Sequence, residues 1–116
     1  MERNATRKDE TEKKAWLYAG KVDSDLNLFE EKLRSLNEFV EKKEGYNVIA
    51  RTCDHPDDPD DLARPTIAEI FKRAWVGDFD ILIIPSMDQI SKIESSRCCF
   101  EIMMKHSNVE IIALDS

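Results

Sequence analysis

Carboxylates, hydroxyls and cations gather in four short stretches of this sequence, and each stretch follows an apolar segment. The stretches are residues 21–25, 53–61, 86–92 and 115–116. Carboxylate oxygens are hard ligands that suit Mg²⁺. A hydroxyl beside cationic side chains can instead attack a phosphate, because the cations stabilise the charge that develops on the phosphoryl oxygens. These residue types therefore allow two chemistries, an acidic magnesium pocket or a phosphoryl-transfer site, if the fold brings the stretches together.

The segments between these stretches alternate between strand and helix patterns. One buried helix face is predicted from apolar positions spaced three and four apart, which are Leu26, Phe29, Leu33, Leu36 and Val40. Strict alternation with short connections predicts an α/β domain with a mainly parallel sheet of about four strands and helices on both faces. The expected strands are residues 15–22, 46–53, 79–85 and 109–114, and the expected helices are residues 26–43, 64–76 and 92–106.

In a sheet of this kind the carboxyl ends of the strands meet at one edge, where sites are usually found. All four polar stretches follow strands, so we expect the functional residues at that edge. Asp23, Ser24 and Asp25 are also candidates to cap the first helix. The Asp-rich segment 55–61 contains two prolines and is expected to form an exposed loop.

Several side chains are expected to do no chemistry. The cysteines lack a C-x-x-C pair, so a zinc site is not expected, and all three are assigned to the core or its margin. The histidines are assigned to the surface and both tryptophans to packing. The second helix is expected to bury Ile67, Ile70, Phe71, Ala74 and Trp75, and the third to bury Cys99, Phe100, Ile102 and Met103.

Composition limits the possible partners. The 116 residues suit one domain, with a polar tail over residues 1–14 and a folded region over residues 15–116. A net charge of −7 opposes DNA binding through the overall field, so a separate region would have to supply most of the DNA affinity. Apolar runs are too short to cross a bilayer, and an odd number of cysteines without a secretion signal predicts reduced thiols in the cytoplasm. No membrane partner and no cofactor are expected.

The order and spacing of several motifs resemble the catalytic domain of resolvase/invertase-type serine recombinases. Residues 18–22 (YAGKV) match the family's tyrosine-alanine-arginine-valine pattern at the end of the first strand, with one residue inserted at Gly20. Arg64 and Pro65 match an arginine-proline pair, and residues 88–92 (DQISK) overlay an Asp-Arg-Leu-Ser-Arg motif. The resemblance covers residues 15–116 and implies the resolvase-like three-layer fold.

The resemblance implies metal-free cleavage of DNA by a serine nucleophile, with arginines that bind the scissile phosphate. In this alignment Lys21 takes an arginine position, Asp23 falls on the nucleophilic serine, and Ser24 is its neighbour. Two further arginine positions hold Gln89 and Lys92. Lysine keeps the charge but not the bidentate fork, and glutamine loses the charge.

Only two positions of the implied site, Arg64 and Asp88, are unchanged. We therefore expect a degenerate recombinase domain that works as a non-cleaving binding or assembly module, as a homodimer or with a partner recombinase. Arg64 could contact phosphate or pair with the Asp-rich loop, Asp88 could orient its loop, and Lys92 could contact an anion or simply face solvent.

Two alternatives stay open. Ser24 could reach the nucleophile position if the insertion lies elsewhere, which would leave a weakly active recombinase fragment. The carboxylates Asp23, Asp25, Asp54 and Asp88 could instead form a magnesium-binding pocket like that of a phosphoacceptor receiver, although the fifth strand and lysine of such domains are missing.

Overall fold

A computed structural model describes residues 12–21, 26–43, 45–55, 62 and 64–115. Residues 1–11 of the tail expected over residues 1–14, the caps at residues 23–25 and most of the Asp-rich loop lie outside these described residues. Lys13 and Lys14, also assigned to the tail, belong to a strand instead. The elements, in chain order, are β1 (Lys13–Lys21), α2 (Leu26–Lys42), β2 (Tyr46–Asp54), α3 (Pro65–Trp75), β3 (Ile81–Ile84), the 3-10 turn η1 (Met87–Gln89), α4 (Glu94–His106) and β4 (Glu110–Ala113).

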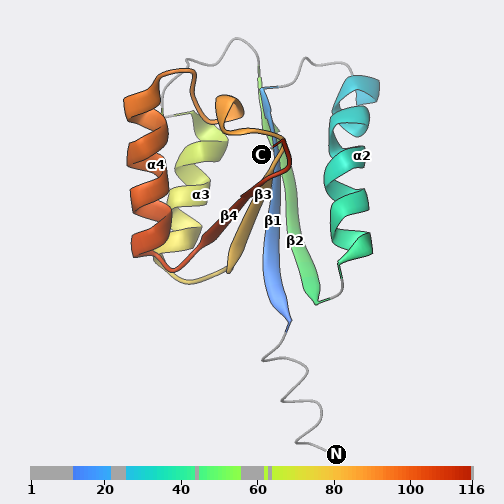
Figure 1. Cartoon of the computed structure of the whole chain (residues 1–116), viewed down its shortest axis with the longest axis horizontal. Coiled ribbons are helices and arrows are strands. Elements are labelled where there is room, and N and C mark those ends of the chain that lie inside the picture. Colours follow the sequence, from blue (N-terminus) through green and yellow to red (C-terminus); the bar gives the residue numbers. More distant parts are fainter. Residues whose placement is uncertain (1–11, 22–25, 44, 56–61, 63, 116) are drawn as a thin grey trace, which may run out of the picture.

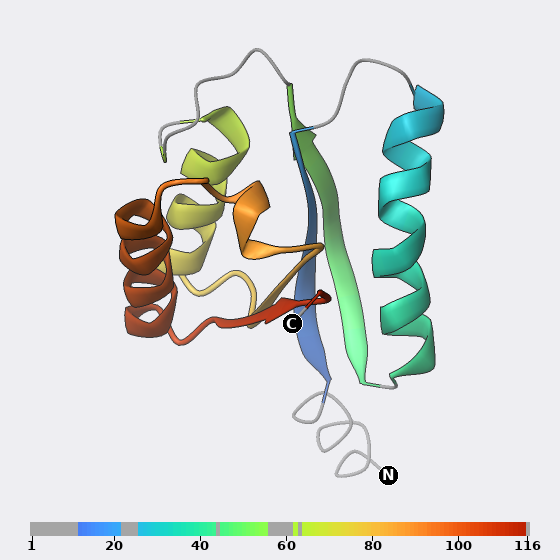
Figure 2. The same cartoon turned by 45° about the horizontal axis from the view of Figure 1, so that its top comes forward.

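The four strands form one parallel sheet in the order β2-β1-β3-β4. Figure 1 and Figure 2 show α2 on one face of the sheet and α3 and α4 together on the other. The predicted α/β architecture, a mainly parallel four-stranded sheet between helices, is confirmed. Because every strand points the same way, the carboxyl ends of β1, β2, β3 and β4 share one edge.

Both faces of the central strands are buried, which explains their nearly unbroken apolar sequence. Along β1, Ala15, Leu17 and Ala19 face the α2 side and pack with Leu33 and Leu36. The intervening Trp16 and Tyr18 face α3 and α4. The strand β3 alternates in the same way, with Ile81 and Ile83 in the first cluster and Leu82 and Ile84 in the second. The two strands thus divide the core into two layers.

The helix α4 differs from its prediction. It begins at Glu94 rather than at Lys92, and its buried residues are Phe100 and Met104. Cys99, Ile102 and Met103 are exposed instead of buried. Residues four apart lie on the same side of a helix. The side with Phe100 and Met104 packs against the sheet, and the neighbouring apolar side with Cys99, Ile102 and Met103 does not.

Trp75 was also wrongly assigned to the core. It is the last residue of α3, beyond the buried positions Ile67, Ile70 and Ala74, and 81% of its surface is exposed. Cys98 and Cys99 are exposed, and Cys53 is partly buried, so only Cys53 matches the expected core margin. Trp16 is a core residue, and both histidines are exposed, as predicted.

The strand limits differ from their predictions by one or more residues. The strand β1 begins at Lys13, earlier than expected. The strand β3 is shorter than predicted, because Phe79 and Pro85 lie outside its paired register.

Among the described helices, none combines the length and the apolar character that crossing a bilayer requires.

Candidate functional site

A buried polar network lies where β1, β2 and the start of α3 meet. The Tyr18 hydroxyl donates a hydrogen bond to Asp54 Oδ2 over 2.8 Å. The other carboxylate oxygen of Asp54 accepts the backbone N–H of Thr66 at 2.9 Å. This bond holds the first turn of α3, whose N–H groups have no partner within the helix. The carboxylate therefore ties the end of β2 to the beginning of α3.

Arg64 completes this network and extends it to η1. Its Nη2 atom donates to the carbonyl oxygens of Gln89 and Ile90, each at 2.7 Å, and its Nε atom lies 3.8 Å from Asp54 Oδ2. Only 1% of the Arg64 surface is exposed. Charged residues are almost never buried unless they are paired, so the carboxylate and the two carbonyls are what makes this burial possible.

Arg64 was predicted as either a phosphate contact or an ion-pair partner of the Asp-rich loop. The structure places its guanidinium against Asp54, just before that loop, while loop residues 56–61 lie outside the described residues. Sequence reasoning did not identify the carbonyls of Gln89 and Ile90 as its partners. Every residue has the same backbone carbonyl, so no residue type in the sequence could have indicated these two partners.

The loop that carries Asp88 is held from a second side by α4. Arg97 donates to the Ser91 carbonyl at 3.0 Å, and its guanidinium lies 3.6 Å from Asp88. The Ser91 hydroxyl accepts the N–H of Ile93 at 3.0 Å, just before α4 begins. Asp88 is largely exposed, so its ion pair contributes little to stability. Arg97 was not predicted as a site residue.

Gly20 brings the end of β1 against η1. Between Tyr18 and Lys21 the strand advances three residues while β2 advances two, from Thr52 to Asp54, so β1 contains one extra residue at this point. Gly20 has a φ of +91°, and a Cβ there would lie 2.8 Å from the Cβ of Gln89. Glycine is the residue that this close approach and positive φ favour.

The remaining predicted site residues are only partly placed. Lys21 pairs with Asp54 in the strand register, but the structure does not describe the Lys21 side chain. Asp23 and Ser24 lie outside the described residues. Lys92 is exposed between η1 and α4. The described structure thus joins Arg64 to the η1 loop that carries Asp88, whereas the predicted nucleophile region stays a prediction.

Metal binding gains no support from the described residues. Among them, no three carboxylate, histidine or cysteine groups are close enough together to hold a metal ion. Both oxygens of Asp54 already accept hydrogen bonds, from Tyr18 and from Thr66. Asp54 is therefore occupied as a structural carboxylate.

Burial raises the pKa of the Tyr18 phenol well above its ordinary value, and the adjacent Asp54 carboxylate raises it further despite the opposing effect of Arg64. Burial and Asp54 also raise the pKa of the neighbouring Cys53 thiol. Both groups thus stay protonated in the folded protein at neutral pH. The phenol acts as a hydrogen-bond donor and the thiol is a poor nucleophile.

The raised pKa of the Tyr18 phenol predicts that the folded protein loses stability at alkaline pH. The unfolded phenol ionises near its ordinary pKa of 10.0, while the folded phenol keeps its proton, so ionisation favours the unfolded state as the pH rises above 10. We expect wild type to lose about 1.4 kcal/mol of unfolding free energy per pH unit there, beyond the loss shown by Tyr18→Phe. Urea unfolding of both proteins between pH 8 and roughly pH 11 measures this difference. Equal losses in the two proteins would contradict the prediction.

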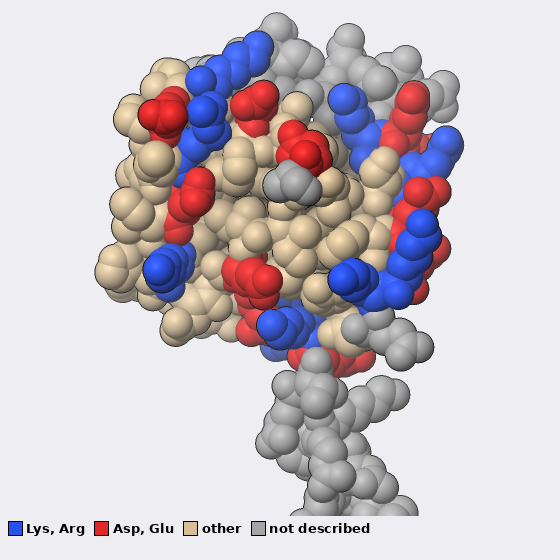
Figure 3. All heavy atoms as spheres, in the orientation of Figure 1, with Lys and Arg blue, Asp and Glu red and all other residues tan. Residues whose placement is uncertain are grey.

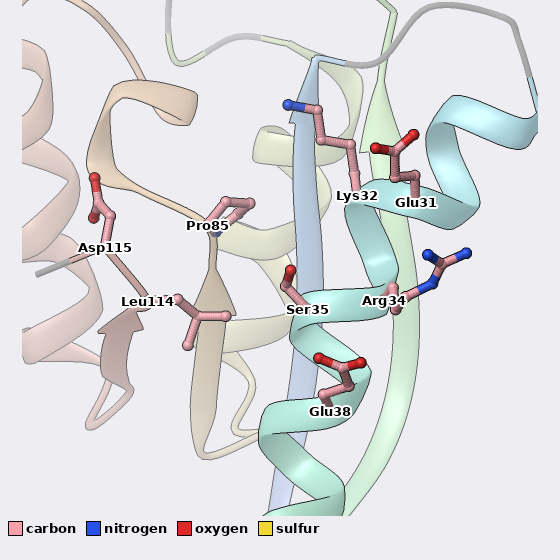
Figure 4. A pocket seen from close by; sticks show the side chains of 8 residues that line it. All are labelled: Glu31, Lys32, Arg34, Ser35, Glu38, Pro85, Leu114 and Asp115. Atoms are coloured by element: carbon pink, nitrogen blue, oxygen red, sulfur yellow. The ribbon is translucent and has the colours of Figure 1, made fainter.

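A separate hollow of about 680 Å³ lies on the other face of the sheet, between α2 and the ends of β3 and β4. Figure 4 shows Ser35 of α2 across from Pro85 and Leu114, with Arg34 pointing away. In Figure 3 the outer face of α2 carries blue and red groups side by side. Because the described lining mixes both charge signs, it does not define an anion site. The charged residues of the lining are Glu31, Lys32, Arg34, Glu38 and Asp115, of which only Asp115 lies in a polar stretch singled out in the sequence.

The fold matches solved catalytic domains of serine recombinases. Over 87% of its length, the chain aligns with 67% of the catalytic domain of ISC1926 TnpA, an IS607-like serine recombinase, with a TM-score of 0.74 and 21% identity. The N-terminal catalytic domain of TP901-1 integrase aligns with a TM-score of 0.75 and 18% identity, covering 89% of this chain and 78% of that chain.

A resolvase family site-specific recombinase from Streptococcus pneumoniae is also similar. Its TM-score is 0.67 at 12% identity, covering 90% of this chain and 73% of that chain. These likenesses establish the fold and agree with the resemblance of the motifs. By sequence, no protein-family model and no curated protein matches the chain.

Proposed function

We propose that this chain is a serine recombinase-type catalytic domain that does not cleave DNA by itself and serves as a binding or assembly module. The fold supports the first part of this proposal. The residues support the second, because Lys21, Asp23, Gln89 and Lys92 occupy positions where the family uses arginine or serine. A separate region or protein would supply most of the affinity for DNA, since the chain carries a net charge of −7.

The observation that carries the proposal is the environment of Arg64. The matching arginine of the family contacts the scissile phosphate, which requires its guanidinium to reach the DNA. In this chain the Arg64 guanidinium is buried and donates to the carbonyls of Gln89 and Ile90. Turning toward a phosphate would break these charge-assisted bonds and take the positive charge away from Asp54.

The loss of transition-state contacts works in the same direction. One missing donor to the charge that develops in a transition state typically costs about 3–4 kcal/mol, or 10²–10³ in rate. Gln89 lacks a charge, and lysine at positions 21 and 92 cannot form the bidentate contact. A carboxylate at Asp23 would repel the phosphate. Although such effects are not additive, together they favour a domain without measurable cleavage.

A covalent-adduct assay tests this proposal. The whole chain is fused to a sequence-specific DNA-binding domain and mixed with nicked suicide substrates that trap a phosphoserine link. We expect no SDS-resistant protein–DNA adduct from the wild-type fusion, because Asp23 stands at the implied nucleophile position and the phosphate contacts are reduced. A fusion of the same DNA-binding domain to an active serine recombinase domain is the positive control.

Ser24→Ala separates the main alternative from the proposal. An adduct that forms with wild type and disappears with Ser24→Ala would identify Ser24 as the nucleophile and refute the non-cleaving role. For the assembly role, the expected result is co-purification of the chain with a partner recombinase, or a homodimer in sedimentation equilibrium. A chain that stays monomeric and binds no recombinase would contradict that role.

The receiver-like alternative has less support, because both oxygens of Asp54 are already used in hydrogen bonds. Millimolar Mg²⁺ should therefore leave the melting temperature of the chain unchanged. A clear rise in melting temperature with Mg²⁺ would instead favour the acidic pocket.

A further inference from the structure

The outward side of α4 carries a stripe of exposed residues. The inward side packs into the core through Phe100 and Met104. Figure 1 and Figure 2 show α4 at the margin of the molecule, with α3 and the sheet on its inner side. Residues spaced three and four apart share one side of a helix. Those on the side opposite the buried pair form what we call the outer α4 stripe, and all are exposed: Ser95, Cys98, Ile102 and Lys105.

Opposite charges lie at the two ends of this stripe. Glu94 is in the first turn of α4, beside Cys98, and Lys105 is in the last turn. Within the described part of the chain, no ion pair engages the side chain of Glu94 or Lys105. Their positions differ by eleven residues, which is about 16 Å along a helix. The two charges therefore cannot pair within one chain, and each is open to an opposite charge on another molecule.

We propose that two copies of this chain associate through their outer α4 stripes, with the two helices antiparallel about a two-fold axis. If the axis passes near residue 100, Glu94 of each copy lies level with Lys105 of the other, so the dimer contains this contact twice. Cys98 of one copy then faces Ile102 of the other. Ile102 is 56% exposed in the single chain and would gain apolar cover.

The charge pattern favours a second copy over other occupants. A uniformly acidic or basic partner would satisfy one end of the stripe and be repelled by the other, whereas an antiparallel copy satisfies both. A parallel copy would instead place Lys105 against Lys105 and Glu94 against Glu94. The helix itself carries two acidic side chains and the two basic side chains of Arg97 and Lys105, so apart from His106 it is electrically balanced.

The acidity of the whole chain limits the strength of the dimer. Each copy carries a net charge of −7, which opposes association at long range, although salt screens this repulsion over about 8 Å at physiological ionic strength. One pair of 13-residue helices also buries less surface than a standard interface. We therefore expect a weak dimer, with a dissociation constant on the order of 0.1 mM.

A weak dimer suits a domain that is concentrated locally when several copies are held in one assembly. The inference thus rests on the proposed assembly role, whose partner it names as a second copy of this chain. It holds whether or not the domain cuts DNA, because the outer α4 stripe includes no residue of the Arg64 network.

Charge reversal tests the contact in sedimentation equilibrium of the full chain under reducing conditions. Lys105→Glu should weaken the dimer about tenfold, because each dimer loses two attractive contacts and gains two repulsive ones. The double variant Glu94→Lys with Lys105→Glu should restore the wild-type affinity, since opposite charges meet again. Rescue reports a contact between copies, because the two positions cannot pair within one chain.

Lys42→Glu is the matched control for this experiment. It changes the net charge by the same amount as Lys105→Glu, at an exposed lysine in the last turn of α2 on the other face of the sheet. We expect it to leave the dissociation constant within about twofold of wild type, because long-range repulsion is screened. Melting temperatures show whether each variant is folded.

The exposed cysteines of α4 supply a second readout. A short bismaleimide should link two copies of the wild-type chain, because Cys98 lies near the proposed axis. The double variant Cys98→Ser with Cys99→Ser should give no linked dimer. Cys53→Ser should leave the yield unchanged, since Cys53 is a partly buried residue of β2. Lys105→Glu should lower the yield, and adding Glu94→Lys should restore it.

Three results would overturn the proposal. They are a chain that stays monomeric at millimolar concentration, a dimer that Lys105→Glu does not weaken, and a weakened dimer that Glu94→Lys does not rescue. A monomeric chain that still binds a partner recombinase, or a dimer that ignores Lys105→Glu, would overturn this interface and leave the assembly role intact. A chain that neither self-associates nor binds a recombinase would refute both.

Discussion

Replacing Arg64 with methionine should lower the free energy of unfolding by about 3–5 kcal/mol, because it breaks a buried ion pair from one side. Methionine fills similar space without donors, so the carbonyls of Gln89 and Ile90 lose these hydrogen bonds. Asp54 keeps its bonds from Tyr18 and Thr66 but loses the nearby positive charge. Urea unfolding at neutral pH measures the effect.

Arg73→Met is the matched control, since Arg73 also pairs with two carboxylates but is half exposed. Its substitution should have a much smaller effect, because solvent screens both ion pairs. If Arg64→Met and Arg73→Met destabilise the protein equally, the buried network does not hold η1. The double variant with Asp54→Asn and Arg64→Met should lose less unfolding free energy than the sum of the losses of the two single variants. The reason is that the double variant no longer contains the unpaired carboxylate.

Phe100→Ala should destabilise the protein by about 3–5 kcal/mol, the usual cost of removing a phenyl ring from a packed core. Phe100 is fully buried and packs against Phe71, so its loss would leave a cavity between α4 and the sheet. The measurement is again equilibrium unfolding, with the slope of the transition checked for a two-state change.

Ile102→Ala is the informative comparison, because the sequence alone predicts that this residue is buried. The structure leaves Ile102 more than half exposed, so its substitution should change the unfolding free energy by at most about 0.5 kcal/mol. An effect of Ile102→Ala as large as that of Phe100→Ala would mean that α4 presents its other apolar stripe to the sheet.

Comparing the strands with helix α4 shows where prediction from the sequence succeeds and where it fails. The strands were predictable because β1 and β3 are buried on both faces, which leaves a nearly continuous apolar run that few other structures produce. The orientation of α4 was not predictable. Its apolar residues form two adjacent stripes, and the sequence does not say which of them the sheet will cover.

The sequence predicted which segments lie near the candidate residues, but it did not predict the contacts that those residues make. Strand alternation predicted Asp54 at the carboxyl edge, the family resemblance singled out Arg64, and the insertion inferred at Gly20 coincides with the extra residue in β1. The bonds from Arg64 to the carbonyls of residues 89 and 90 join positions 25 and 26 residues apart. Such contacts depend on the path of the backbone, which residue types alone do not specify.

The central place of β1 in the sheet has a consequence for how the protein is made. β1 pairs on one edge with β2, which follows it after α2, and on its other edge with β3, which is synthesised much later. Lys14, at the start of β1, bonds to Asp80, just before β3, and these residues are 66 positions apart. At about 5–20 residues per second, the ribosome needs roughly 3–13 s to add those residues. During that time the β3-facing edge of β1 and the side chain of Trp16, which packs against Phe79, lack their final cover. A chaperone that holds extended apolar segments would therefore find its substrate in the first half of the nascent chain.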